Sequence, residues 1–236
     1  IYDYALTATQ VNDHYKASGR TSSLPEPPED EYGAAVFDQE PDLYWRLGES
    51  SGTTAADSGW MRNHGTYFGT HTKGRPGAVL GTTNTAVEFN GTSGYVASVG
   101  SATNPQVFST EAWFRTTSTS GGKIIGFGNQ RTTLSSQYDR HPFMLDTGQI
   151  TFGVYPGAET RVTSPKSYND GEWHHVVSTL SPDGMRLYVD GELVDSNPNT
   201  AAEGFNGYWR VGGDRVWSGA SSNFFNGTID EVAVYS

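Results

Sequence analysis

Two adjacent histidines, His174 and His175, lie beside Glu172 and Trp173 in the segment EWHHVVSTL. Imidazole and carboxylate groups are common ligands of transition metals. The β-branched residues that follow favour a strand, however, and successive side chains of a strand point to opposite faces. The helical H-E-x-x-H spacing of zinc proteases is also absent. We therefore predict that both histidines are strand residues, one packed and the other facing out or toward a turn.

A second set of side chains suits a hard cation. Calcium takes six to eight oxygen ligands, in which carboxylates and backbone carbonyls are mixed. Asp57 lies in the glycine-bearing segment AADSGWMRNHG, and Asn63 follows six residues later. Asp230 alternates with Val232 and Val234, so it faces the core if they do, and a buried carboxylate without a partner is costly. The sequence predicts a metal site at these three polar residues. The alternative is that Asp57 caps its own loop and that Asp230 pairs with an arginine.

Two further segments combine aromatic rings with polar groups, which suits the binding of sugars. They are SSQYDRHPF and GGDRVWSGASSNFF, and both are expected to form loops on a rigid scaffold, where function concentrates. The candidate ligand-binding residues are Tyr138, Asp139, Arg140, Asp214 and Trp217. The alternative is that Trp217 packs into the core and that Asp139 pairs with Arg140.

Catalytic chemistry has less support. Glycoside hydrolysis needs two carboxylates that face each other across a groove. Asp230 and Glu231 are adjacent in TIDEVAVY, so on a regular strand they point to opposite faces. The sequence therefore favours a protein that is not an enzyme.

Short alternating segments from Tyr32 onward predict the scaffold that positions these residues. Examples are YVASV, EAWFRT, ITFGVY and HHVVSTL, and Asp-Gly or Asn-Gly pairs separate many of them. MRLYVDGELVDS predicts a hairpin with Asp190-Gly191 as its two-residue turn. Many short strands with such turns, and no long helices, are typical of an all-β antiparallel sandwich.

The N-terminal part of the chain has a different pattern. Residues 5–17 predict a short helix, because Thr7 and Gln10 fit a capping box and Gly19 can end it. The segment TSSLPEPPED that follows is rich in proline and acids and predicts a linker.

The opening IYDYAL is similar to the final VAVYS. We therefore expect residues 1–19 to be the tail of a preceding repeat, residues 20–31 to be a linker and residues 32–236 to be the β-sandwich domain. Coincidence is the alternative, since such sequences are common at strand ends.

Five segments in order resemble one protein family. DLYWRLGESSGTTAADSG, VEFNGTSGYV, STEAWFRT, DGEWHHVVSTLSPDGMRLYVDGELV and GTIDEVAVY are similar to the laminin-G-like, concanavalin-A-like jelly-roll domains of bacterial secreted proteins. The resemblance covers nearly all of residues 42–236. It implies two antiparallel sheets packed face to face, binding of carbohydrate or cell surfaces, and a structural calcium ion. In the family an Asp of the early A-D-S loop and groups at the last strand hold this ion. ALTATQVNDHY is similar to the segment that follows the last strand in the family.

Composition limits the remaining function classes. The net charge of −11 argues against nucleic-acid binding, and no apolar run approaches the roughly 20 residues that span a bilayer. The absence of cysteine excludes disulfides and thiolate chemistry.

We expect a non-catalytic, calcium-stabilised module of a secreted or cell-surface protein that binds carbohydrate or glycoconjugates and adjoins other domains of the same polypeptide. The alternatives are a structural or adhesive spacer without a small ligand and, least favoured, a glycoside hydrolase of the same fold.

Overall fold

Strand β8 (Phe108–Arg115) shows how the sequence builds the sheets. Its residues alternate between buried and half-buried along their whole length, and Phe108, Ala112 and Phe114 face the core. A strand with this alternation packs one face on a core and leaves the other face for solvent or a covering element. The same alternation recurs in β15 (His174–Ser181).

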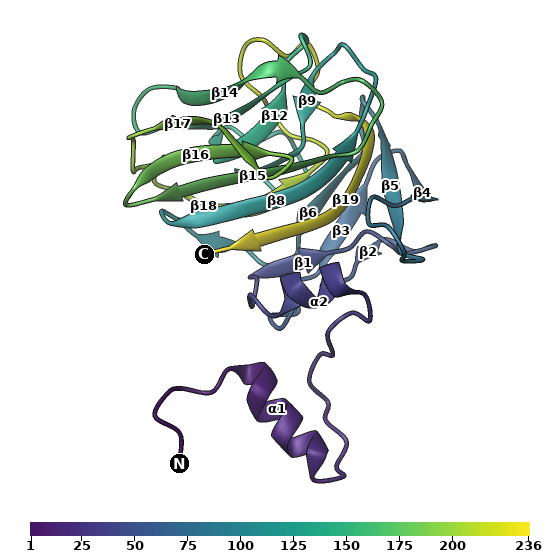
Figure 1. Ribbon diagram of the computed structural model, residues 1–236. Coiled ribbons are helices and arrows are strands. Elements are labelled where there is room, and N and C mark those ends of the chain that lie inside the picture. Colours follow the sequence, from purple (N-terminus) through teal and green to yellow (C-terminus); the bar gives the residue numbers. More distant parts are fainter.

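The computed structural model describes residues 1–236 and consists mainly of antiparallel strands (Figure 1). The two helices are α1 (Ala8–Ala17) and α2 (Glu31–Phe37). Besides β8 and β15, the strands are β1 (Leu43–Trp45), β2 (Thr54–Ala55), β3 (Gly65–Phe68), β4 (His71–Pro76), β5 (Thr85–Asn90), β6 (Tyr95–Ser98), β7 (Ala102–Thr103), β9 (Gly122–Lys123), β10 (Ile125–Gly128), β11 (Tyr138–Asp139), β12 (His141–Met144), β13 (Gln149–Val154), β14 (Thr160–Ser167), β16 (Gly184–Val189), β17 (Glu192–Asn197), β18 (Asn206–Val211) and β19 (Asn226–Tyr235).

The strands form three sheets. An eight-stranded sheet has the order β17-β16-β15-β8-β19-β5-β4, with β1 paired to β19. A seven-stranded sheet has the order β11-β10-β18-β6-β3-β2, with β7 paired to β18, and a four-stranded sheet has the order β14-β13-β12-β9. One core of 33 buried residues draws side chains from all three sheets. The predicted antiparallel jelly-roll sandwich is confirmed.

The predicted hairpin is also confirmed. β16 and β17 pair antiparallel, with Val189 opposite Glu192. Asp190 and Gly191 between them both have positive φ, at 53° and 80°, as a type I′ turn requires.

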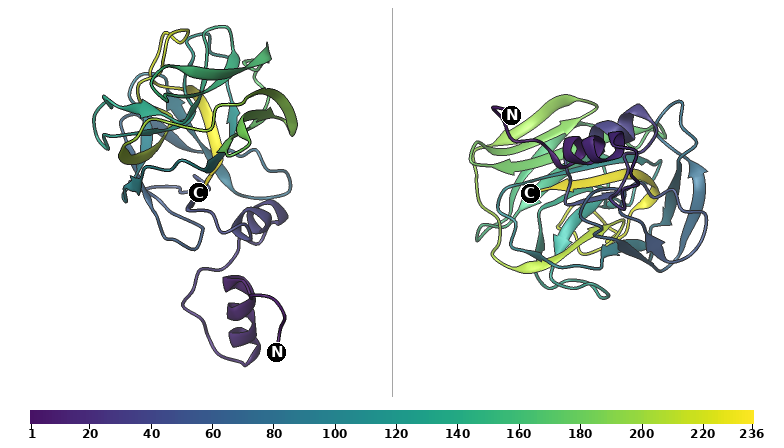
Figure 2. Two further views of the ribbon diagram at one scale, coloured as in Figure 1. Left: turned by 90° about the vertical axis from the view of Figure 1, so that its left-hand side faces the viewer. Right: turned by 90° about the horizontal axis from the view of Figure 1, so that it is seen from below.

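Helix α1 agrees with its sequence signals. The Thr7 side chain accepts a hydrogen bond from the Gln10 N–H, and the Gln10 side chain accepts one from the Thr7 N–H, which completes the predicted capping box. The helix lies apart from the sandwich, at the far end of an extended segment (Figures 1 and 2). No helix is long and apolar enough to cross a membrane.

Helix α2 was not predicted from the sequence. Asp30 caps it by accepting a hydrogen bond from the Gly33 N–H. Its residue Val36 packs on Tyr44 and Ala233, so the helix covers part of the outer face of the eight-stranded sheet. Asp30, which lies inside the segment 20–31 that was expected to be a linker, therefore caps a helix that packs on the sandwich.

Candidate functional site

The paired histidines diverge, as predicted. His174 makes contacts of 2.9 Å from Nδ1 to Asp190 and 3.0 Å from Nε2 to Asp170. His175 instead contacts Glu111, with 3.1 Å from Nε2 to Oε1, and its ring lies 4.9 Å from that of Trp113. The two imidazoles share no partner, so they do not form one metal site.

Asp57 uses both carboxylate oxygens to hold its own loop. Its Oδ1 accepts hydrogen bonds from the N–H groups of Tyr44 and Gly59, at 2.8 and 2.9 Å. Its Oδ2 accepts one from the N–H of Asn63 at 2.6 Å. This is the loop-capping role that the sequence left open as the alternative. Asn63 therefore meets Asp57 through its main chain, and its carboxamide is directed elsewhere.

Asp230 and Glu231 lie on the same side of β19, which corrects the expectation that they face opposite ways. The register between β19 and β8 shifts at this point, and Glu231 has a φ of 48°. Such a bulge turns an adjacent side chain that regular pleating would have sent to the other face. Both carboxylates are fully buried, and both contact the Asn84 carboxamide.

Three oxygen atoms converge on the Nδ2 atom of Asn84. They belong to the Arg46 carbonyl at 3.1 Å, Asp230 Oδ1 at 3.4 Å and Glu231 Oε1 at 2.9 Å. A carboxamide nitrogen has only two hydrogens, so one acceptor is surplus. The second oxygen of Asp230 accepts a hydrogen bond from the Ala78 N–H at 2.8 Å.

The charge of this cluster is only partly balanced. Arg46 pairs with Glu231 at 2.8 Å and with Asp30 at 2.7 Å, so one guanidinium serves two carboxylates and Asp230 has no ion pair. Burial, together with the neighbouring Glu231, raises the pKa of Asp230 to about 7. A polar hollow of about 680 Å³, lined in part by Arg46 and Asn84, opens beside the cluster.

The structure does not bring Asp57 and Asp230 together. The hydrogen-bond partners of Asp57 lie in its own loop and at the start of β1, whereas those of Asp230 lie at residues 78, 84 and 231. No three or more His, Cys, Asp and Glu side chains gather as a metal site. A cation at Asp230 would therefore need amide and carbonyl oxygens as well.

The expectation that the two aromatic loops expose their polar residues is wrong for Asp139, Arg140 and Asp214. All three are fully buried. Asp139 forms an ion pair with Arg140, which was the stated alternative. Asp214 accepts hydrogen bonds from the N–H and hydroxyl groups of Ser135, at 2.8 and 2.7 Å. These side chains fix the loops to one another.

Trp217 is also buried, at 6% exposure, and Tyr138 is half-buried. Both rings surround His141, with ring centroids at 4.5 Å from Trp217 and 6.0 Å from Tyr138. Tyr138 also lies beneath the Lys123 ammonium, at 5.6 Å from the ring centroid. His141 lies in the segment SSQYDRHPF that the sequence singled out, whereas sequence reasoning missed Lys123, because it follows two glycines and belongs to no motif.

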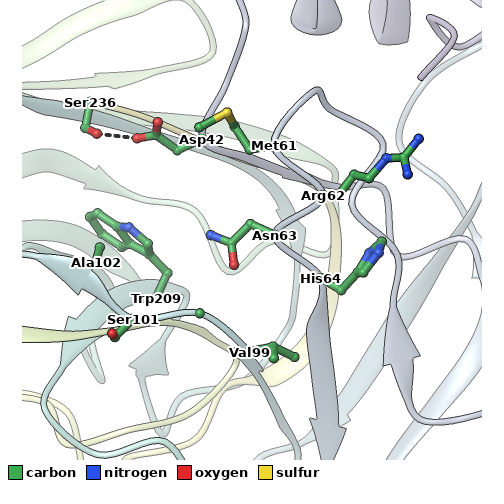
Figure 3. Close-up of a pocket in the computed structure, with 11 residues that line it drawn as sticks. Asp42, Met61, Arg62, Asn63, His64, Val99, Ser101, Ala102, Trp209 and Ser236 are labelled. Atoms are coloured by element: carbon green, nitrogen blue, oxygen red, sulfur yellow. Dashed lines mark hydrogen bonds between the residues drawn. The ribbon is translucent and has the colours of Figure 1, made fainter. Parts of the chain in front are cut away.

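A surface pocket of about 510 Å³ lies at the end of β19, and of its lining residues only Asn63 was a candidate from the sequence (Figure 3). Its polar lining includes Asp42, Asn63 and Ser101, and the Trp209 indole forms part of the wall. In Figure 3 the Asn63 carboxamide points toward Trp209, and Ser236 donates a hydrogen bond to Asp42.

Several hydrogen-bonding groups of this pocket have no partner within the chain. Asn63 and Trp209 make hydrogen bonds through main-chain atoms, which leaves the Asn63 carboxamide and the Trp209 indole N–H unused. His64 accepts a hydrogen bond at Nδ1 from the Asp57 N–H, so its Nε2 carries the proton in the neutral ring. The apolar side chains of Met61 and Val99 are exposed at the rim, at 65% and 55%.

Comparison with known proteins places the chain in a family. The family described as Laminin_G_3, concanavalin A-like lectin/glucanases superfamily, matches residues 90–236. The chain belongs to this superfamily. The chain is also 28% identical over 115 residues to the rat protein "Sushi, von Willebrand factor type A, EGF and pentraxin domain-containing protein 1", and 27% identical over 114 residues to its mouse counterpart. Each match covers 48% of this chain and only 3% of the relative.

Solved structures share the fold of this laminin-G-like domain. A sialidase of Trypanosoma rangeli, in complex with 2,3-difluorosialic acid, superposes with a TM-score of 0.59 and 16% identity. The superposition covers 95% of this chain and 36% of the sialidase chain. The same enzyme in complex with sialic acid gives a TM-score of 0.59 over 35% of its chain. At this identity the likeness concerns the fold alone.

Proposed function

We propose that this laminin-G-like domain is a non-catalytic carbohydrate-binding module of a secreted or cell-surface protein, and that its glycan site is the pocket at Asn63, Ser101 and Trp209. The observation that carries the proposal is the set of unused hydrogen-bonding groups in a hollow of about 510 Å³ beside exposed Met61 and Val99. Sugar rings present hydroxyls and apolar C–H faces, and a site with both kinds of lining complements them. Membership of a lectin-like superfamily supports the same function.

The pocket favours binding over hydrolysis. Glycoside hydrolysis in most families uses two carboxyl groups, about 5 to 9.5 Å apart, on either side of the scissile bond. Among the pocket residues Asp42 is the one acid, and it accepts a hydrogen bond from Ser236. The earlier candidates Asp139, Arg140, Asp214 and Trp217 contribute to this function only indirectly, by fixing the loops in which they are buried.

A glycan array with the intact chain tests this proposal. Asn63→Ala and Ser101→Ala should each weaken binding of a hit glycan about 3- to 10-fold, because each removes a net contribution of about 0.5–1.5 kcal/mol. Ser196→Ala is the matched control, since Ser196 is exposed on β17 and does not line the pocket. The proposal fails if no glycan binds, or if the pocket variants and the control bind alike.

We also propose that calcium stabilises the domain at the Asp230 cluster. The supporting observation is the convergence of three oxygens on Asn84 Nδ2, with two adjacent buried carboxylates and one arginine nearby. With its carboxamide turned over, Asn84 would offer an oxygen in place of the nitrogen. Asp230, Glu231, Asn84 and the Arg46 carbonyl would then hold the ion, which is a mixed oxygen set of the kind that calcium prefers. Of the predicted ligands, this proposal retains Asp230.

A further inference from the structure

Lys123 and His141 form a buried polar pair that neither proposed site uses. Both side chains are fully buried. The Lys123 Nζ and both ring nitrogens of His141 have no hydrogen-bond partner in the chain. Both side chains approach Gly126 of β10: a Cβ added there would lie 3.1 Å from Lys123 Nζ and 2.6 Å from His141 Cβ. The two side chains therefore meet over one glycine.

No acid forms an ion pair with Lys123, although Asp214 and Asp139 act on its charge from a longer distance. The nearest acids already have partners, since Asp139 pairs with Arg140 and Asp214 accepts hydrogen bonds from Ser135. Burial lowers the pKa of Lys123 to about 8, so the ammonium form still predominates at pH 7. A buried ammonium without a partner is among the most costly arrangements in a protein interior.

Lys123 and His141 together have more hydrogen-bond donors than acceptors. Lys123 carries three N–H donors and no acceptor, and a neutral His141 carries one of each. Together they have four donors and one acceptor, and the Tyr138 ring face at 5.6 Å offsets only a small part of this excess. A water molecule brings as many donors as acceptors, so water alone leaves the excess in place. An anion such as a halide only accepts.

The walls around the pair are aromatic. Trp217 packs edge-to-face on His141 at 4.5 Å, and the Phe143 ring lies 4.7 Å from it. Trp217 itself fits against Gly153, where an added Cβ would lie 2.1 Å from its ring. Neither Lys123 nor His141 lines the two hollows described above, and both side chains are fully buried. Buried, largely aromatic surroundings suit a weakly hydrated monovalent anion better than strongly hydrated phosphate.

We propose that the Lys123 ammonium and the His141 imidazole bind a small monovalent anion, of the size of a halide, beneath Trp217. The anion accepts hydrogen bonds from Lys123 Nζ and from one ring N–H of His141, and it ties β9 to β12. This role is structural, and it is independent of the glycan pocket and of calcium.

Bromide is the probe that tests this inference. Crystals of the intact chain soaked in sodium bromide should show an anomalous peak within hydrogen-bond distance of Lys123 Nζ. In solution, bromide at about ten times its Kd should raise the Tm by about 3–6 °C relative to sodium sulfate at equal ionic strength.

Lys123→Met keeps the length of the side chain and removes the charge, and an apolar replacement of a buried charge is generally tolerated. It should abolish the bromide-dependent rise, whereas Lys166→Met, at an exposed position, should retain it. Water density without an anomalous peak in the wild-type crystal would overturn the inference, and so would an equal rise in Lys123→Met. The wild-type crystal decides the question even if the variant fails to fold.

Discussion

At the scale of single residues, the left-handed backbone conformation of Glu231 brings two acidic side chains of the last strand together. Regular alternation would separate Asp230 from Glu231, but Glu231 adopts a φ of 48° and both carboxylates reach Asn84. Positive φ is uncommon outside glycine and persists where the surroundings fix it. Here Arg46 and Tyr44 hold Glu231 in place through hydrogen bonds.

The raised pKa of Asp230 makes the calcium-free domain sensitive to pH. An acid whose pKa rises on folding, here from 3.8 to about 7, binds more protons in the folded state between these two values. Its contribution to stability is therefore fully present below pH 4 and is lost as the pH rises through about 7. Chelated wild type should lose stability relative to Asp230→Asn between about pH 4 and pH 7, as urea unfolding would measure. Parallel pH profiles for the two proteins would contradict the raised pKa.

Calcium binding should offset, at neutral pH, the stability that the domain loses when the buried Asp230 carboxylate ionises. An ion that binds only the folded state stabilises it by about 2.7 kcal/mol at a hundredfold excess over Kd, or roughly 5–11 °C in Tm for a chain of this size. We expect the Tm to rise with calcium, to fall with a chelator, and to become independent of calcium in Asp230→Asn. Asp57→Asn should keep the dependence on calcium, because Asp57 serves its own loop. An unchanged wild-type Tm would exclude this site.

The sequence predicts the orientation of the two strand histidines, but it does not predict the burial of the acidic residues in the loops. The divergence of His174 and His175 follows from alternation alone, so it could be predicted without tertiary contacts. The burial of Asp139 and Asp214 could not, because it depends on partners distant in sequence, such as Glu203 and Ser135. A polar side chain is usually exposed, but it can be buried where other residues supply its hydrogen bonds, and those residues cannot be identified from the local sequence.

At the scale of elements, α2 is the part that links the N-terminal segment to the sheet. The helix is only seven residues long, too short to be stable by itself, so tertiary contacts must hold it. The Tyr32 hydroxyl donates to Glu111 of β8, and Asp30 joins the helix N-terminus to Arg46. These long-range contacts explain why the short segment EYGAAVF carries little signal of its own.

Asp30→Ala should measure the docking of α2. The substitution removes both the N-cap and the ion pair with Arg46, and the loss of such a cap alone costs about 1 kcal/mol. We expect the Tm to fall by about 2–4 °C or more. Asp13→Ala is the control, because Asp13 is an exposed residue of α1 that caps no helix. Equal Tm values for the two variants would show that α2 does not contribute to the stability of the sandwich.

At the scale of the whole molecule, the sandwich and α1 share few contacts. The hydrogen bonds that link residues 1–29 to the rest of the chain run from the Ala8 N–H to Glu40 and from Arg62 to the Ser23 carbonyl. The Val11 and Tyr15 side chains of α1 are exposed. Two separate exposed apolar side chains are normal on a protein surface, so the expectation that residues 1–19 belong to a preceding repeat stays a prediction.

Two deletions test where the folding unit begins. Removal of residues 1–29 should leave a cooperative unfolding transition with a Tm near that of the intact chain, because only two hydrogen bonds link this segment to the rest. Removal of residues 1–38 should lower the Tm clearly, because it removes α2 and exposes Tyr44 and Ala233 to solvent. Calorimetry of both truncated chains separates the outcomes. If the shorter deletion unfolds the sandwich, α1 belongs to this domain, and if the longer one has no effect, the unit begins at β1.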